Sequence, residues 1–293
     1  MSNTNENQSV AKTNINWYPG HMAKTKRIIK ENINLIDIVY EVIDARMPLS
    51  SKIKDIDEYL GNVKKILIMT KIDMCDMDET NKWIKYYEDK GYTVYPVNLE
   101  KETKFNKLLD LTNKLMEDTN AKREAKGMSK RKTRVLVVGI PNAGKSTLIN
   151  RLVGKKVVNT GNMPGVTKQV SWIRVSNDIE LMDTPGILWP KLDNQTIALN
   201  LASLTSIKEE ILPIDDVVYY ILKTLEKYYP NLLEARYGLN KINDFEDALV
   251  HIGSKRGCLV KGGCVDYDKT YSVIMQDIKQ GLVGGITFDR IEE

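Results

Sequence analysis

Two short patterns in this chain have the residue types that bind a nucleotide. The first, GIPNAGKS from Gly139 to Ser146, fits the phosphate-binding pattern GxxxxGK[ST]. It follows an apolar run and precedes a helical pattern, which is the context that this motif needs. Gly139 and Gly144 allow backbone geometries closed to other residues, so successive N–H groups and a helix N-terminus can surround phosphate oxygens. We expect Lys145 to reach the β and γ phosphates and Ser146 to ligate Mg²⁺.

The second pattern, Thr70-Lys71-Ile72-Asp73, fits the guanine-reading sequence [NT]KxD. The Asp73 carboxylate can accept hydrogen bonds from N1–H and the 2-amino group of guanine together, which adenine cannot match. Lys71 is expected to lie along the base plane. Thr70 stands where Asn is usual, so the amide that braces this loop is missing. The alternative is an ordinary surface turn.

The order of the two patterns is unusual. In the common arrangement of these motifs the base-reading loop follows the phosphate loop, whereas here residues 70–73 come first. The parts are therefore present, but the chain enters the fold at a different strand.

Two further segments fit a nucleotide site with Mg²⁺. In Asp183-Thr184-Pro185-Gly186, Asp183 would hold the metal through water and the Gly186 N–H would meet the γ phosphate. Thr167, in the segment MPGVT, would coordinate the metal, although a Pro-Gly turn is the alternative. Asn98-Leu99 stands where a base-backing segment is expected.

No glutamine follows the DxxG pattern to orient an attacking water, because Ile187 occupies that position. The chain has two histidines, His21 and His251. His21 lies in the segment WYPGHM, and an imidazole with a pKa of about 6.5 can position or deprotonate water. A structural role or an RNA contact is the alternative. His251 has the setting of an ordinary helix residue.

Apolar runs that alternate with helical patterns predict a parallel α/β sheet. The expected strands are 38–43, 65–69, 92–97, 134–139, 170–175 and 178–182. The expected helices are 78–90, 103–117, 145–153 and 214–229. We predict a disordered leader with the WYPGHM motif (1–25), an α/β domain (26–190) and an all-helical domain (191–293).

Composition excludes a membrane span, since no apolar run approaches the ~18 residues required. The polar N-terminus lacks a signal core, which favours a cytoplasmic protein. Three cysteines without a CxxC pair argue against a zinc site.

Charge is unevenly distributed along the chain. Residues 191–293 carry 12 Lys and Arg against 16 Asp and Glu, a net charge of −4, while residues 1–190 carry 31 against 23, a net charge of +8. Residues 122–134 hold seven basic residues and one acid, which fits either a contact to nucleic-acid phosphates or a solvated linker.

Together these motifs resemble the circularly permuted GTPases of ribosome biogenesis over about residues 15–290. The segments that carry the resemblance are WYPGHMAK, TKID, GIPNAGKST, MPGVT, DTPGILWPK, RGCLVKGG and QGLVGGIT. The resemblance implies a circularly permuted P-loop GTPase domain followed by a C-terminal RNA-binding helical domain. It also implies a protein that binds the immature large (50S) ribosomal subunit and its rRNA with GTP and is released by particle-stimulated hydrolysis. By the same resemblance, His21 is catalytic, Asn142 helps to hold a K⁺ ion, and hydrophobic residues near Ile187 guard the γ phosphate.

The combined prediction is a monomeric GTPase that uses GTP/GDP, Mg²⁺ and K⁺. The predicted nucleotide-binding residues are Thr70, Lys71, Ile72, Asp73, Asn98, Leu99, Asn142, Ala143, Gly144, Lys145, Ser146, Thr147 and Gly186. The predicted metal ligands are Ser146, Thr167 and Asp183 for Mg²⁺ and Asn142 for K⁺.

Three departures from the family pattern are Thr70, Asn98-Leu99 and Gly284-Gly285. Because the helical region is net acidic, its RNA contacts would need local donors such as Lys255, Arg256 and Lys261, or the basic residues 122–134. Two other functions stay open: an rRNA-binding scaffold gated by nucleotide with negligible hydrolysis, and a permuted GTPase of the small subunit.

Overall fold

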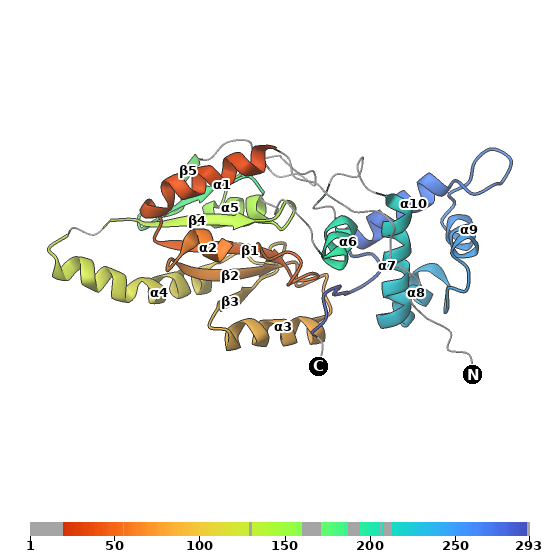
Figure 1. The fold of residues 1–293 in the computed structure, drawn as a ribbon, viewed down its shortest axis with the longest axis horizontal. Helices are drawn as coiled ribbons and strands as arrows, with labels where there is room; N and C mark the ends of the chain where they lie inside the picture. The colour runs from red at the N-terminus through yellow and green to blue at the C-terminus, as the bar shows by residue number, and fades with distance from the viewer. Residues whose placement is uncertain are drawn as a thin grey trace. The chain divides into compact units, whose positions relative to one another are not determined.

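The structure is a computed structural model that describes residues 20–54, 56–128, 131–159, 171–186, 194–204, 207 and 213–291. The described residues form two compact units (Figure 1). One is an α/β unit that comprises residues up to 186 together with 287–291. The other is a helical unit within residues 194–286. The functional division of the chain near residue 190 stays a prediction.

The α/β unit is built on a six-stranded sheet in the order β3-β2-β1-β4-β6-β5. Its strands are β1 (Ile38–Asp44), β2 (Lys64–Thr70), β3 (Thr93–Pro96), β4 (Thr133–Gly139), β5 (Ser171–Arg174) and β6 (Ile179–Asp183). Only β5 is antiparallel to its neighbour, β6, and the other pairs are parallel. All residues of β1 are buried, as expected for a central strand covered on both faces. The predicted mostly parallel sheet is confirmed.

The strand order brings distant parts of the sequence to one edge. Strand β4 lies between β1 and β6, with Val42 opposite Gly139 and Val137 opposite Asp183. Because these strands are parallel, their carboxyl ends meet at the same edge of the sheet. The loops after β1, β2, β4 and β6 therefore share one edge although the chain enters the fold at β1.

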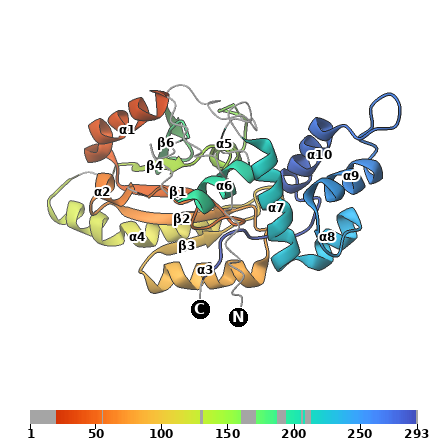
Figure 2. The same ribbon diagram turned by 45° about the vertical axis from the view of Figure 1, so that its right-hand side comes forward.

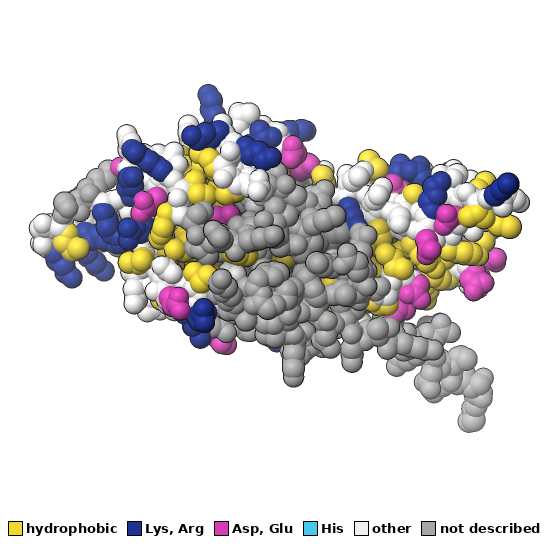
Figure 3. Space-filling view, turned by 90° about the horizontal axis from the view of Figure 1, so that it is seen from above, with side chains coloured by type: hydrophobic (Ala, Val, Ile, Leu, Met, Phe, Trp, Pro, Cys, Tyr) yellow, Lys and Arg dark blue, Asp and Glu magenta, His cyan; other side chains and the backbone are white. Residues whose placement is uncertain are grey.

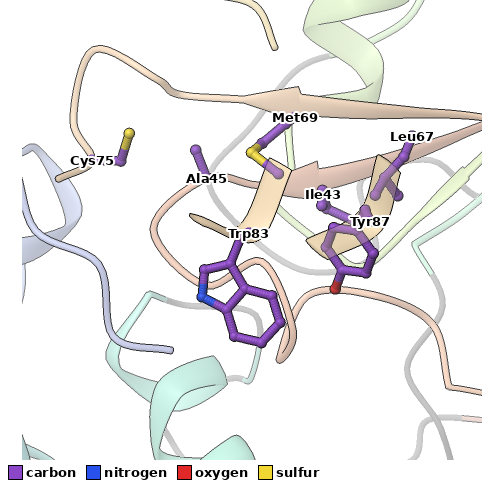
Figure 4. Packing of buried hydrophobic residues seen from close by; sticks show 7 residues of the cluster. All are labelled: Ile43, Ala45, Leu67, Met69, Cys75, Trp83 and Tyr87. Carbon is purple, nitrogen blue, oxygen red and sulfur yellow. The ribbon is translucent and has the colours of Figure 1, made fainter. Parts of the chain in front are cut away.

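Helices cover both faces of this sheet. They are α1 (Gly20–Asn32), α2 (Ile56–Leu60), α3 (Met77–Asp89), α4 (Asn106–Ala125) and α5 (Lys145–Val153). Tyr40 of β1 shares a buried 2.6 Å hydrogen bond with Thr112 of α4. Ile43 points to the opposite face, since side chains alternate along a strand, and belongs to a hydrophobic cluster with Trp83 and Tyr87 of α3 (Figure 4).

Helix α4 is longer than the sequence pattern predicts. The expected helix ended at residue 117 and left residues 122–134 as a contact segment or linker, but α4 continues to Ala125. Arg123, in its last turn, forms an ion pair with Asp37, just before β1. Arg131 pairs with the same carboxylate at 2.8 Å. Asp37 thus offsets the mutual repulsion of the basic residues and fixes both ends of the connection from α4 to β4.

The helical unit contains α6 (Gln195–Ser203), α7 (Ile214–Tyr228), α8 (Pro230–Tyr237), α9 (Phe245–Lys255) and α10 (Tyr267–Lys279) (Figure 2). Helix α7 buries Val217, Val218, Ile221, Leu222 and Leu225, the stripe of an amphipathic helix. Arg236 of α8 holds the carboxylate of Asp277 of α10 with two hydrogen bonds. The predicted helical region is confirmed. Among the described residues, no helix is both long and apolar enough to cross a membrane.

The C-terminal segment (residues 287–291) returns from the helical unit to the α/β unit. The Phe288 N–H donates to the carbonyl of Arg46 at 2.7 Å, and Trp83 Nε1 donates to the Asp289 carbonyl at 3.2 Å. The sequence analysis grouped these residues with 191–293, but their hydrogen bonds are to the loop after β1 and to α3.

Candidate functional site

The phosphate-binding pattern forms a tight loop between β4 and α5. A Cβ atom at Gly139 would lie 2.4 Å from the carbonyl oxygen of Val42, so only glycine fits there. Gly144 has φ +97° and Asn142 has φ +62°, a region that residues other than glycine rarely occupy. The loop leads directly into the N-terminus of α5, whose free N–H groups favour an anion. The backbone geometry therefore suits a bound phosphate chain.

Lys145 lies at the bottom of this loop and is 7 % exposed. Its Nζ donates a 2.7 Å hydrogen bond to the carbonyl of Ile140. Burial lowers the pKa of the Lys145 ammonium, and the negative charge of Asp183 opposes that shift. An incoming phosphate would add a second negative charge and favour the protonated lysine further.

The DxxG segment lies against the phosphate loop, as its sequence position predicts. Asp183 ends β6 and is fully buried. A Cβ atom at Gly186 would lie 2.7 Å from the backbone nitrogen of Pro141, so this glycine lets the two loops touch. Carboxylate and hydroxyl oxygens are the ligands that Mg²⁺ prefers, and Asp183 with the partly exposed Ser146 supplies them. The donor set at this edge therefore fits a magnesium ion.

The loop with the predicted guanine-reading pattern, residues 70–73, is hydrogen-bonded to the phosphate loop. Thr70 Oγ1 lies 2.7 Å from the carbonyl oxygen of Ala143 and 3.0 Å from that of Ile43. Lys71, with φ +58°, donates from Nζ to the carbonyl of Asn142 at 2.7 Å. The amide expected at this position is missing, and the Thr70 hydroxyl makes a bracing contact to the phosphate loop in its place.

The remaining base-site residues lie around these contacts. Asp73 is exposed, and its carboxylate is therefore accessible to a base. Asn98 accepts hydrogen bonds from the backbone N–H groups of Glu100 and Lys101, which fixes the loop after β3. Leu99 is buried, and its Cδ1 would lie 3.3 Å from a Cβ at Gly144. The structure thus brings the loops after β2, β3 and β4 together.

The sequence analysis did not predict the buried ion pair behind this site. Arg46 is 1 % exposed and holds the Asp44 carboxylate through Nε at 3.0 Å and Nη2 at 2.9 Å. Lys71 Nζ donates to the same carboxylate at 2.9 Å. Burial alone would raise the pKa of Asp44, but the charges and hydrogen bonds of Arg46 and Lys71 outweigh it and hold that pKa well below its ordinary value. The available signal was the pair of opposite charges in IDAR directly after an apolar strand.

Three predicted site positions lie outside the described residues or side chains. Thr167 and Ile187 are not among the described residues, and His21 is described only as part of the backbone of α1. The other histidine, His251, lies in α9, with Nε2 at 3.1 Å from the carbonyl oxygen of Tyr237. That contact agrees with an ordinary helix residue.

Comparison with known proteins gives concordant matches. A protein-family model described as "50S ribosome-binding GTPase" matches residues 134–246. Ribosome biogenesis GTPase A of Priestia megaterium is 44 % identical over 277 residues, which cover 94 % of this chain and 96 % of the relative. A GDP-bound structure of YlqF matches with a TM-score of 0.64 and 26 % identity, covering 91 % of this chain and all of the YlqF chain. A GNP-bound YlqF structure from T. maritima matches with a TM-score of 0.65 and 26 % identity, covering 91 % and 98 %.

The permuted strand order and the converging loops define a circularly permuted P-loop GTPase, which binds GTP and GDP and hydrolyses GTP. Within that class, the chain belongs to the ribosome biogenesis GTPase A family. It is therefore a GTPase of ribosome biogenesis.

Proposed function

We propose that this GTPase acts late in the assembly of the large (50S) ribosomal subunit in the bacterial cytoplasm. As a monomer with GTP bound, it would bind immature particles and their rRNA. Hydrolysis stimulated by the particle would then release it. The observation that carries this proposal is the contact of the guanine-reading loop with the phosphate loop through Thr70 and Lys71. That contact would bring the two parts of a GTP site together in a permuted chain.

In this proposal the protein supplies positioning and charge. The N–H groups of residues 142–147 surround the phosphates, Lys145 compensates the charge of the β and γ phosphates, and Gly186 donates its N–H to the γ phosphate. Ser146, Asp183 and Thr167 would hold Mg²⁺, which neutralises phosphate charge when it is bound. The side-chain oxygen of Asn142 would contribute to a K⁺ site.

Base selectivity would depend on Asp73, which accepts from N1–H and the 2-amino group of guanine. The Lys71 stem and Leu99 would flank the base. Lys71 cannot move freely, because its Nζ already bridges Asp44 and the carbonyl of Asn142. The base-reading and phosphate-binding loops would therefore respond together to nucleotide.

Contact with rRNA would involve local donors in the helical unit. Between α9 and α10 the chain forms a short hairpin with a bridge from Leu259 to Val265. Its exposed tip carries Lys261, and Leu259 and Val260 are 44 % and 47 % exposed. Arg256, at the base of the hairpin, lies 3.7 Å from Asp277. The hairpin thus presents a cation and apolar side chains to a partner despite the acidic charge of the region.

Hydrolysis would be assisted by His21, because Ile187 cannot orient water. The test is GTP turnover in potassium buffer, with and without immature large-subunit particles, for wild type, His21→Ala and the control His251→Ala. We expect particles to stimulate wild type and His251→Ala, and His21→Ala to lose the stimulation while it still binds GTP. Stimulation that survives in His21→Ala would assign catalysis to another group. Absence of stimulation in wild type would refute the particle-activated mechanism and favour a nucleotide-gated scaffold.

A further inference from the structure

The C-terminal segment is bound to the loops that support the base-reading site. The Asp289 carboxylate is 6 % exposed and accepts hydrogen bonds from Leu49 N at 2.8 Å, Ser50 N at 2.7 Å and Ser50 Oγ at 2.6 Å. These donors are in the loop that follows Arg46, and the Arg46 carbonyl accepts from Phe288 N–H at 2.7 Å. A carboxylate that accepts two buried backbone N–H groups and a hydroxyl fixes the path of that loop.

The same segment binds the start of α3, on the other side of the base-reading loop. Thr287 Oγ1 accepts from the N–H of Asp76 at 3.2 Å and shares a 3.1 Å hydrogen bond with Thr80. Asp76 is the N-cap of α3 and comes three residues after Asp73. Glu79, in the first turn of α3, forms a 3.2 Å ion pair with Arg290.

Apolar contacts reinforce these hydrogen bonds. Ile291 packs against the hydrophobic cluster around Trp83. The members of this cluster in Figure 4 include Ala45 and Met69. Ala45 precedes Arg46, and Met69 precedes Thr70. Both supports of the base-reading loop therefore share one core with the last residues of the chain.

A continuous set of contacts then reaches the nucleotide site. The Phe288 N–H donates to the Arg46 carbonyl, and the Arg46 guanidinium donates to the Asp44 carboxylate. Lys71 donates to the same carboxylate. Lys71 in turn donates to the carbonyl of Asn142 in the phosphate loop. Each step joins buried or half-buried groups whose partners are fixed, so a displaced segment alters the position of residues 70–73.

We propose that the C-terminal segment is a positioning element for guanine recognition and that Asp289 is its principal residue. This inference rests on the proposed role of Asp73 as the guanine reader. The segment does not touch the base. It holds the loop after Arg46 and the start of α3, which together set the position of the Asp73 carboxylate.

The test compares GDP with inosine diphosphate, which lacks the 2-amino group of guanine. Binding of both nucleotides is measured by fluorescence competition for full-length wild type and Asp289→Asn. An amide keeps one acceptor oxygen for the Leu49 and Ser50 N–H groups but loses the negative charge, so the hydrogen bonds that fix the Leu49–Ser50 loop weaken. We expect the preference for GDP over inosine diphosphate to fall about tenfold or more.

The matched control is Asp37→Asn, a second buried carboxylate that accepts from backbone and side-chain donors, at the opposite end of β1. It should lower the thermal stability of the protein without changing the preference for GDP. An unchanged preference in folded Asp289→Asn would overturn the inference, and so would an equal loss of preference in both variants. A wild type that binds the two nucleotides equally would instead refute the role of Asp73.

A second pair of variants decides the matter if Asp289→Asn does not fold. Thr287→Val removes the hydroxyl that contacts Asp76 and Thr80, and Thr112→Val removes an equally buried hydroxyl from α4. We expect the preference for GDP to fall about threefold or more in Thr287→Val and to stay unchanged in Thr112→Val, since only Thr287 contacts the start of α3. Equal preferences in the two variants would overturn the inference.

Discussion

Strand β1 has a buried carboxylate at each end, and the two ends differ in what surrounds the carboxylate. Asp37 directly precedes the strand and Asp44 ends it. Their side chains are 3 % and 1 % exposed, and each is bound by two basic side chains. The chemistry is the same at both ends, so the difference lies in the partners.

At the nucleotide edge one of the two partners, Arg46, is fully buried. The side chains of Arg46 and Lys71 are 1 % and 25 % exposed. Lys71 also donates a hydrogen bond to the carbonyl of Asn142 in the phosphate loop. Buried ion pairs contribute little net stability, because desolvation offsets their attraction, but they fix geometry where every group is hydrogen-bonded. This end of β1 therefore positions loops.

At the opposite edge the partners reach solvent. The side chains of Arg123 and Arg131 are 21 % and 38 % exposed. Two positive charges meet one carboxylate there, so the surface keeps a net positive charge. Figure 3 shows Lys and Arg side chains gathered at the end of the α/β unit where α4 runs into β4. This end of β1 holds a charged surface in place.

The largest effect is expected for Asp44→Asn. The change leaves Arg46 buried without its counter-charge, and breaking a buried pair in this way costs about 3–5 kcal/mol. We expect the free energy of unfolding in urea to fall by that amount and GDP affinity to fall with it, since Lys71 also loses its anchor. A loss of no more than about 2 kcal/mol, the size expected for Asp37→Asn, would show that the two ends of β1 are equivalent.

The pH dependence of the unfolding free energy should reveal the contribution of the ionised Asp44 carboxylate. The pKa of Asp44 is lowered in the folded protein, so the carboxylate stabilises the fold above its ordinary pKa of about 3.9, and this contribution is lost as pH falls toward the folded value. The unfolding free energy of wild type should therefore decrease more steeply between about pH 5 and 3 than that of Asp44→Asn. Glu79 and Glu226, whose pKa values are also lowered, titrate in both proteins and cancel in the comparison. Parallel pH profiles would contradict the prediction.

The elements that the sequence predicts are those set by local pattern. Apolar runs place the strands, and the phosphate-binding pattern places the turn between β4 and α5, because only glycine fits beside Val42 at its start. The permuted order of the motifs follows from their positions alone. These features need no knowledge of distant contacts.

The features that sequence reasoning missed depend on long-range partners. Asp289 accepts a hydrogen bond from Ser50, and the two are separated by 239 positions in the sequence. Arg131 and Asp37 pair over a separation of 94 positions. Local charge pattern predicts that residues 122–134 are a contact to nucleic acid or a solvated linker, whereas α4 continues to Ala125 and pairs Arg123 with a distant carboxylate. The burial of Arg46 is likewise not predictable from the sequence, because it depends on the ion pair with Asp44 inside the fold.

A smaller effect is expected for Asp37→Asn, because Arg123 and Arg131 can turn their guanidinium groups to water. The loss concerns hydrogen bonds from partly exposed arginines to a charged acceptor, so the free energy of unfolding should fall by about 1–2 kcal/mol. GDP affinity should stay within about twofold, since the partners of Asp37, which are Arg123, Arg131 and Arg134, lie at the end of the sheet away from the phosphate loop. Calorimetry and nucleotide titration on the same sample measure both. A loss as large as that of Asp44→Asn would remove the distinction between the two ends.

The smallest effect on stability is expected at three lysines of the charged surface. Lys122, Lys126 and Lys132 make no ion pair at Asp37, so their combined change to Gln should alter the free energy of unfolding by no more than about 0.5 kcal/mol. Arg131 is kept because its removal would disturb the Asp37 contact.

Binding of the lysine variant to rRNA or large-subunit particles should still change. Each lost phosphate contact reduces the slope of log affinity against log salt by about 0.7–0.9. A variant with the same change in charge at another surface is the control: Lys82→Gln and Lys85→Gln on α3 and Lys90→Gln at its C-cap. If both triple variants keep the wild-type slope, the surface held by Asp37 is a solvated connection. A general change in net charge would lower the slope of both triple variants alike. If only the variant of Lys122, Lys126 and Lys132 has a reduced slope, the Asp44 end of β1 supports nucleotide binding and the Asp37 end supports RNA binding.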